Sequence, residues 1–198
     1  MNVVNLNENK ELKSSNNTEK EKSKEIEVYN GILKGLKVHI EDEKSKKLYE
    51  KGYYGNFENN ILILEPLEAL LLLERKRLNI YDENDKNYNF RELSEYFVKN
   101  IPNFWTKYLV YKDIRSRGYI IRQGFGESIE FRVYDRGVIA GESAAKYLLH
   151  PITEGTPLKL VDLAKITKIA KSSRKKLVLT VVDRQGEVTY YQCKEVLL

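Results

Sequence analysis

The segment Phe131–Gly137 has the sequence F-R-V-Y-D-R-G, and its pattern of side chains decides the fold class of the chain. Ile129, Phe131 and Val133 alternate with polar residues, which predicts a strand with one buried face. The segment S-S-R-K-K-L at Ser172–Leu177 leads into a second apolar stretch. These two segments therefore predict strands of one β-sheet, each with basic side chains beside it.

The rest of the C-terminal half adds further strands to this sheet. Tyr147–Leu149 is predicted to be a strand that Pro151 ends, because proline cannot donate to a ladder. Leu177–Val182 and Val188–Cys193 are predicted to be two strands joined by the turn D-R-Q-G.

Two helices are expected around these strands. Asn103 is placed to cap a helix whose apolar residues recur at helical spacing until Gly118 stops it. Thr156-Pro157 is expected to open the other helix by capping and by the fixed φ of proline. The order helix, strands, helix, two strands predicts a mixed sheet with helices packed on it.

The N-terminal half, from residue 26 to about residue 100, predicts a small α/β domain. Gly31 and Gly35 are expected to break strand-forming sequence, and Lys46–Gly52 predicts a short helix. Ile61–Leu64 predicts a buried strand, and Pro66 stands where a first helical turn tolerates it. Further helices are expected at Leu67–Lys76, covered on more than one side, and at Phe90–Phe97. The fold class is therefore α/β (α+β).

Composition limits the classes of protein to which the chain can belong. The 198 residues carry a formal net charge of +5 with a pI near 9.0, a mild excess that permits a polyanionic partner without identifying one. Cys193 is the single cysteine, so neither an intrachain disulfide nor a thiolate cluster is expected, and the two histidines show no metal-ligand spacing. With no apolar signal region and no run long enough to span a bilayer, the expected location is cytoplasmic.

Residues 1–25 are rich in Asn, Lys, Glu and Ser and are expected to form a flexible tail, since such a segment buries too little apolar surface. The expected division of the chain is a tail at 1–25, an N-terminal α/β domain at 26–100 and a C-terminal mixed-sheet domain at 101–198. The break between the domains is placed at K-N-I-P-N, residues 99–103.

Several motifs together resemble the archaeal tRNA-splicing endonuclease family. They are F-R-V-Y-D-R-G, the K-Y-L-L segment at Lys146–Leu149, S-R-K-K-L, and Y-K-D-I-R-S-R-G-Y at Tyr111–Tyr119. The less specific segments L-Y-E-K-G-Y-Y-G and L-E-P-L-E-A-L-L-L-L-E resemble the N-terminal domain of the family. The resemblance implies a nuclease-like catalytic domain, here in a single-unit subunit, and no cofactor or metal.

The resemblance also implies the active-site residues. The family cleaves RNA with a tyrosine, a histidine and a lysine, without metal, and leaves 2′,3′-cyclic phosphate and 5′-OH ends. Tyr134 matches the general base and Lys175 matches the cation that steadies charge on the phosphoryl oxygens. The position of the general acid, three residues before Tyr147, is occupied by Ala144.

Two explanations account for Ala144. It is either an engineered replacement for histidine that disables the enzyme, or a native residue of a non-catalytic structural or RNA-binding subunit that supports a catalytic partner. A subunit freed from catalysis is free to lose Tyr134 and Lys175 as well, and both are retained. That retention favours the engineered replacement.

The resemblance implies a precursor tRNA as substrate, cut at exon–intron junctions within a bulge–helix–bulge. Phosphate-seeking side chains near the motifs are Arg136, Lys168 and Arg174, and these are the candidate RNA-binding residues. Because one RNA is cut twice, the family works as an oligomer, which implies a homo-oligomer (dimer or tetramer) or a heterotetramer with a second subunit. The segment Tyr190–Val196 is expected to pair subunits, and an acidic loop with Asp183 and Glu187 to dock into a neighbour.

Overall fold

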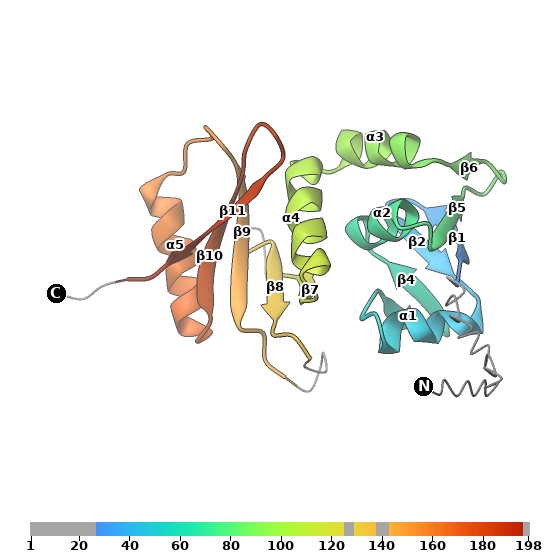
Figure 1. Cartoon of the computed structure of the whole chain (residues 1–198), viewed down its shortest axis with the longest axis horizontal. Helices are drawn as coiled ribbons and strands as arrows, with labels where there is room; N and C mark the ends of the chain where they lie inside the picture. The colour runs from blue at the N-terminus through green and yellow to red at the C-terminus, as the bar shows by residue number, and fades with distance from the viewer. Residues whose placement is uncertain (1–26, 125–128, 138–142, 196–198) are drawn as a thin grey trace, which may run out of the picture.

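The computed structural model describes residues 27–124, 129–137 and 143–195. The predicted tail at 1–25 lies outside the described residues. The described residues form two mixed sheets with five α-helices, and the sheets lie side by side with helix α4 between them (Figure 1). This arrangement agrees with the predicted α+β class. None of the described helices is both long enough and apolar enough to cross a membrane.

The N-terminal sheet has the strand order β3-β4-β2-β1-β5-β6, in which only β1 and β5 run parallel. Its strands are β1 (Tyr29–Lys34), β2 (Lys37–Ile40), β3 (Asn56–Glu58), β4 (Ile61–Leu64), β5 (Leu78–Tyr81) and β6 (Asn87–Tyr88). Gly31 was expected to break the strand, but it lies inside β1. A Cβ there would come within 2.5 Å of Val38 Cγ1, so the close approach of β1 and β2 explains the glycine.

Three α-helices accompany this sheet, and all three were predicted. They are α1 (Lys46–Glu50), which follows a 3₁₀ turn at Glu43–Ser45, α2 (Pro66–Glu74) and α3 (Phe90–Asn100). Helix α2 is buried from Glu68 to Leu72, as expected for a helix covered on more than one side. Its first turn is closed by a capping box between Glu65 and Glu68.

The C-terminal sheet has the strand order β11-β10-β9-β8-β7, with β9 and β10 parallel and the other pairs antiparallel. Its strands are β7 (Ile120–Gln123), β8 (Phe131–Tyr134), β9 (Tyr147–Thr153), β10 (Lys176–Val182) and β11 (Val188–Cys193). Helix α4 (Phe104–Ser116) covers one face of this sheet, and α5 (Leu160–Ser172) covers the other (Figure 1).

Alternation along the strands creates these two apolar faces. Leu149 and Val178 belong to the large core that α4 shares with the N-terminal sheet. Their neighbours Leu148 and Leu177 belong to a smaller cluster with Ile166 of α5. Successive side chains of a strand point to opposite faces, so one apolar run serves both helices.

Two predicted boundaries in this half were wrong. Pro151 does not end its strand, because β9 continues to Thr153 in register with β10. The ladder with β8 ends at Leu149, so β9 has a partner on one side only beyond that residue and tolerates a missing N–H. Thr156-Pro157 does not open α5, which begins at Leu160, since Thr156 instead closes a turn onto the Thr153 carbonyl at 3.0 Å.

Asn103 does precede α4, but it does not cap the helix in the expected way. Its backbone is left-handed, with φ 55°, and its side chain makes no capping hydrogen bond. Asparagine tolerates this conformation better than most residues. Here it redirects the chain from α3 into α4.

Candidate active site

Tyr134, Ala144 and Lys175 lie at one end of the C-terminal sheet. Tyr134 is the last residue of β8, Ala144 lies three residues before β9, and Lys175 directly precedes β10. Tyr147 is in register with Val133 on one side and with Lys176 on the other. The end of β8 and the starts of β9 and β10 therefore meet at the lower end of the sheet in Figure 1.

Backbone hydrogen bonds extend the register past the strand ends. The N–H of Lys146 donates to the Val133 carbonyl at 2.9 Å, and the N–H of Lys176 donates to the Lys146 carbonyl at 3.0 Å. The segment that carries Ala144 is thus held between the segments that carry Tyr134 and Lys175. Three motifs far apart in the sequence become neighbours through the topology of the sheet.

Tyr134 is only 8% exposed, although it lies at a strand end. It packs in a small cluster with Ile120, its partner on β7, and with Ala145. The partly buried Tyr53, from the N-terminal half of the chain, packs against the same cluster. The tyrosine is therefore fixed by packing on one side and reaches the sheet end on the other.

Lys175 lies at the junction between α5 and β10. Its N–H donates to the Ala170 carbonyl at 2.9 Å, and its Nζ donates to the Ser173 carbonyl at 3.1 Å. Arg174, which lies between Ser173 and Lys175 in the chain, has a left-handed backbone with φ 55° and is exposed. This tight junction turns the chain from the helix into the strand and keeps the half-buried lysine at the sheet end.

Ala144 is exposed, whereas the next residue, Ala145, is buried against Tyr134. A side chain at position 144 consequently faces solvent at the sheet end. The methyl group of alanine has no proton to donate, so this position contributes no acid to the arrangement.

The structure separates the three candidate RNA-binding residues. Arg136 is exposed two residues after Tyr134, and its guanidinium lies 4.7 Å from the centroid of the Tyr119 ring. Arg174 adjoins Lys175 directly. Lys168 instead lines a groove of about 950 Å³ between α5 and β11, and β11 is three strands away from β8 in the sheet.

Sequence reasoning missed further cations at the sheet end. Lys146 forms an ion pair with Asp135. The Nζ atoms of Lys146 and Lys176 lie 5.5 and 6.0 Å from the centroid of the Tyr147 ring. The adjacent Lys146 and Tyr147 in the sequence were a signal for such contacts. The contact with Lys176, however, depends on the pairing of β9 with β10.

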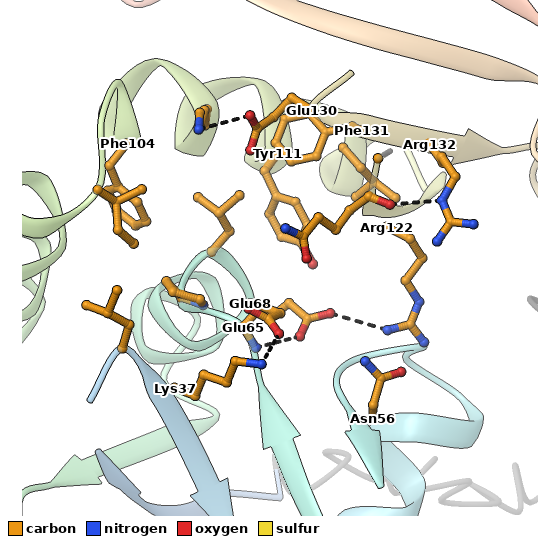
Figure 2. Close-up of a pocket in the computed structure, with 18 of the residues that line it drawn as sticks. Lys37, Asn56, Glu65, Glu68, Phe104, Tyr111, Arg122, Glu130, Phe131 and Arg132 are labelled. Carbon is orange, nitrogen blue, oxygen red and sulfur yellow. Dashed lines mark hydrogen bonds and ion pairs between the residues drawn. The ribbon is translucent and has the colours of Figure 1, made fainter. Parts of the chain in front are cut away.

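A cavity of about 640 Å³ lies between the two sheets (Figure 2). Tyr134 also borders it. Glu68 is 4% exposed there and accepts hydrogen bonds from the N–H groups of Gly55 and Glu65, both at 3.0 Å. The Arg122 guanidinium lies 3.5 Å from the Glu68 carboxylate and donates to the Gly55 carbonyl at 2.8 Å.

Burial raises the pKa of Glu68, against the opposing effect of the two N–H groups and Arg122. In Figure 2 the hydroxyl end of Tyr111 points toward Glu68. This hydroxyl has no hydrogen-bond partner among the described residues, and burial raises the pKa of Tyr111 well above its ordinary value. The cavity therefore combines apolar walls with a few buried polar groups.

No metal-binding group was found in the described segments 27–124, 129–137 and 143–195, in the sense of three or more neighbouring His, Cys, Asp or Glu side chains. The candidate site comprises Tyr134, Ala144 and Lys175 with arginines nearby.

Two adjoining stretches of the chain match family domains. Residues 29–94 match the tRNA intron endonuclease N-terminal domain, and residues 104–190 match the tRNA intron endonuclease catalytic C-terminal domain. The chain belongs to the tRNA intron endonuclease family. Tyr134, Ala144 and Lys175 all fall within the match to the catalytic domain.

Individual relatives agree with this assignment. The chain is 33% identical over 150 residues to a tRNA-splicing endonuclease of Methanothermobacter thermautotrophicus, covering 74% of the chain and 85% of the relative. It is 35% identical over 161 residues to that of Thermococcus onnurineus, covering 81% and 92%. The chain is 36% identical over 162 residues to a tRNA-splicing endonuclease of Methanosarcina mazei, covering 82% of the chain but only 45% of the relative. The chain thus spans about half the length of this last protein.

Proposed function

We propose that this chain is a metal-independent endoribonuclease subunit that cuts precursor tRNA at exon–intron junctions, and that Ala144 disables the present form. The observation that carries the proposal is the meeting of Tyr134, Ala144 and Lys175 at one sheet end, inside the match to the catalytic domain. The chemistry assigned to each position follows from the requirements of RNA cleavage.

Cleavage without metal uses the 2′-hydroxyl next to the scissile phosphate as nucleophile. Its oxygen attacks phosphorus, its proton passes to the deprotonated oxygen of Tyr134, and the bond from phosphorus to the 5′ oxygen breaks. The products are a 2′,3′-cyclic phosphate and a 5′-hydroxyl. The Lys175 ammonium stabilises the charge that builds up on the phosphoryl oxygens.

The departing 5′ oxygen needs a proton, and position 144 is where the acid belongs. Ala144 cannot supply one, and the loss of a general acid costs roughly 10²–10⁴-fold in rate. Because position 144 is exposed at the sheet end, a histidine there has room to reach a substrate.

The decisive experiment compares the chain with its Ala144→His variant on a bulge–helix–bulge RNA in EDTA, following 2′,3′-cyclic phosphate ends. Histidine should raise the cleavage rate by about 10²-fold or more. An Ala144→Asn variant is the matched control, since asparagine is polar but does not act as an acid.

Failure of the Ala144→His variant to cleave, with RNA binding intact, would contradict the proposal. It would favour the alternative, a native non-catalytic structural or RNA-binding subunit of a heteromeric enzyme.

We also propose that the chain acts as a homo-oligomer, dimer or tetramer, or in a heterotetramer with a second subunit. Two observations support this: β11 is an edge strand, and the β10–β11 hairpin presents the exposed Glu187. The carboxylate of Asp183 accepts hydrogen bonds from the N–H groups of Gln185 and Glu187 within the turn, so Asp183 shapes the loop. Glu187→Gln should therefore reduce the assembly mass in light scattering, and an unchanged mass would contradict a docking role for Glu187.

We propose the domain division at residues 100 and 101 as well. The gap between the two family matches, at residues 95–103, supports it. The RNA-binding roles of Arg136, Lys168 and Arg174 also stay proposals, with Lys168 the weakest because it lines the groove at β11.

A further inference from the structure

The turn Lys51–Gly55, within the motif L-Y-E-K-G-Y-Y-G, connects α1 to β3 in an unusual conformation. Tyr53 has a left-handed backbone with φ 54°, as does Gly55 with φ 68°. A Cβ at Gly52 would lie 2.7 Å from the Leu48 carbonyl oxygen, and one at Gly55 would lie 2.6 Å from that of Ile63. Both glycines are therefore required by close packing, and the turn is fixed against its own half of the molecule.

Two arginines from the other half of the chain hold the same turn. Arg115, on α4, donates to the Gly52 carbonyl at 2.6 Å, and Arg122, on β7, donates to the Gly55 carbonyl at 2.8 Å. The Arg115 guanidinium also lies 4.1 Å from the centroid of the Tyr54 ring. The two bonded carbonyls lie on either side of Tyr53 in the chain, so this residue has little freedom to move relative to the C-terminal sheet.

The side chain held in this way packs against the cluster that contains Tyr134. Tyr53 is the member contributed by the N-terminal half, whereas Ile120, Tyr134 and Ala145 come from the C-terminal sheet. Ile120 is paired with Tyr134 across β7 and β8, and Ala145 adjoins Ala144. Tyr53 thus packs against the cluster that contains Tyr134 and Ala145, the neighbour of Ala144.

We propose that Tyr53 is a positioning residue for the cleavage reaction. Its backbone is held by the Arg115 and Arg122 bonds to the neighbouring Gly52 and Gly55 carbonyls, and its ring holds the ring of Tyr134 in the orientation that aims the Tyr134 hydroxyl at the substrate. The inference rests on the function proposed above. A tyrosine at a strand end has rotational freedom that packing must remove, and small displacements of a catalytic group cost much of the rate.

A different role for Tyr53 predicts a different result. Tyr53 also borders a hollow of about 260 Å³, together with Lys51, Tyr119 and Gly137. If a base of the RNA stacked on Tyr53 in this hollow, the ring would contribute to substrate affinity. A positioning residue instead affects the rate of the bound complex.

The first test measures single-turnover cleavage and RNA affinity in the Ala144→His background. Tyr53→Ala should slow cleavage of the bound RNA on the order of 10- to 100-fold and leave the dissociation constant within about twofold. Tyr53→Phe keeps the ring and should keep the rate. Tyr88→Ala, which removes a half-buried tyrosine at the opposite edge of the N-terminal sheet, is the matched control and should leave the rate unchanged. A loss confined to affinity, or no loss in Tyr53→Ala, would overturn the proposal.

The second test needs no activity. The chain as it stands is labelled with ¹³C-tyrosine, and the Tyr134 resonance is assigned with Tyr134→Phe. Tyr53→Ala should shift that resonance, whereas Tyr88→Ala should not, and an unmoved Tyr134 resonance would overturn the positioning contact. If Ala144→His does not cleave but the resonance moves, the proposed function fails while the contact stands, so the two failures are distinguishable.

Discussion

The sheet end, around Tyr134 and Lys175, differs from the seam between the two halves of the chain, around Glu68 and Arg122. The difference lies in how strongly the polar groups are bonded and buried. At the sheet end, Lys146 and Asp135 form an exposed ion pair, and Lys175 makes a single side-chain bond to a backbone carbonyl. In the seam, Glu68 and Arg122 are nearly buried and share several hydrogen bonds. Under the proposed function, the loosely bonded groups are those that the substrate has to reach, and the tightly bonded groups fix the two halves of the chain around them.

The seam extends beyond this pair. The Glu74 carboxylate accepts hydrogen bonds from the Tyr108 hydroxyl at 2.8 Å and from Lys112 Nζ at 2.6 Å. Burial, followed by the bond to Glu74, raises the pKa of Tyr108. Helix α4 is thereby attached to α2 through polar bonds as well as through the shared apolar core.

The largest effect is expected from breaking the buried pair. Arg122→Met leaves the Glu68 carboxylate without its cation and the Gly55 carbonyl without its donor, and it should lower the free energy of unfolding at pH 7 by about 3–5 kcal/mol. Urea unfolding measures this loss. The control is Arg117→Met, which removes the exposed partner of Asp113 at the C-terminal end of α4. It should lower the free energy of unfolding by less than about 1 kcal/mol.

The double variant Arg122→Met with Glu68→Gln sharpens this result. Without a charge at position 68, the loss of Arg122 should be smaller than in the single variant. If Arg122→Met lowered the free energy of unfolding equally with and without Glu68→Gln, the stability of the seam would not depend on pairing a buried charge.

A smaller effect is expected in the pH dependence of stability. The unfolded chain releases the Glu68 proton near the ordinary pKa of 4.5, whereas burial lets the folded chain hold it to a higher pH. The contribution of this group is therefore fully present below pH 4.5 and is lost as the pH rises through the folded pKa. The stability of the original chain relative to Glu68→Gln should consequently fall as the pH rises above 4.5. An increase over that range, in urea unfolding at several pH values, would mean that Arg122 and the two N–H groups outweigh burial.

The smallest effect should come from the exposed pair at the sheet end. Asp135→Asn removes the partner of Lys146, and both side chains are more than two-fifths exposed, at 44% and 42%. Solvent screens such pairs, so the midpoint of thermal unfolding should stay within experimental error. A clear drop in the midpoint would mean that the sheet end is as tightly bonded as the seam, and the contrast between the two regions would be lost.

The sheet end was largely predictable from the sequence, because its residues belong to motifs with strong local signals. Alternation in F-R-V-Y predicted β8, and the apolar run Leu177–Val182 predicted β10. Pairing of β9 with both strands then brings Tyr134 and Lys175 together, which follows once a mixed sheet is assumed. Local patterns did not predict that β9 continues past Pro151, because that depends on where the ladder with β8 ends.

The seam was not predictable in the same way. Glu68 lies in a run of leucines and is an ordinary helix-forming residue by local criteria, and its burial becomes apparent only when Arg122 is placed beside it. Tyr53 belongs to a glycine-bounded turn whose partner, the cluster of Tyr134, is remote in the sequence. Contacts between distant segments that carry no periodic pattern require the structure.

The most direct test of the account asks whether the strand ends act as one site. In the Ala144→His background, single-turnover cleavage would be measured for Tyr134→Phe, Lys175→Ala and the double variant, in EDTA. Residues that serve one transition state show strongly non-additive losses, so the double variant should be about as slow as the slower single variant. Losses that multiply in the double variant would mean that Tyr134 and Lys175 act independently, and would contradict the claim that the meeting of these strand ends forms one catalytic site.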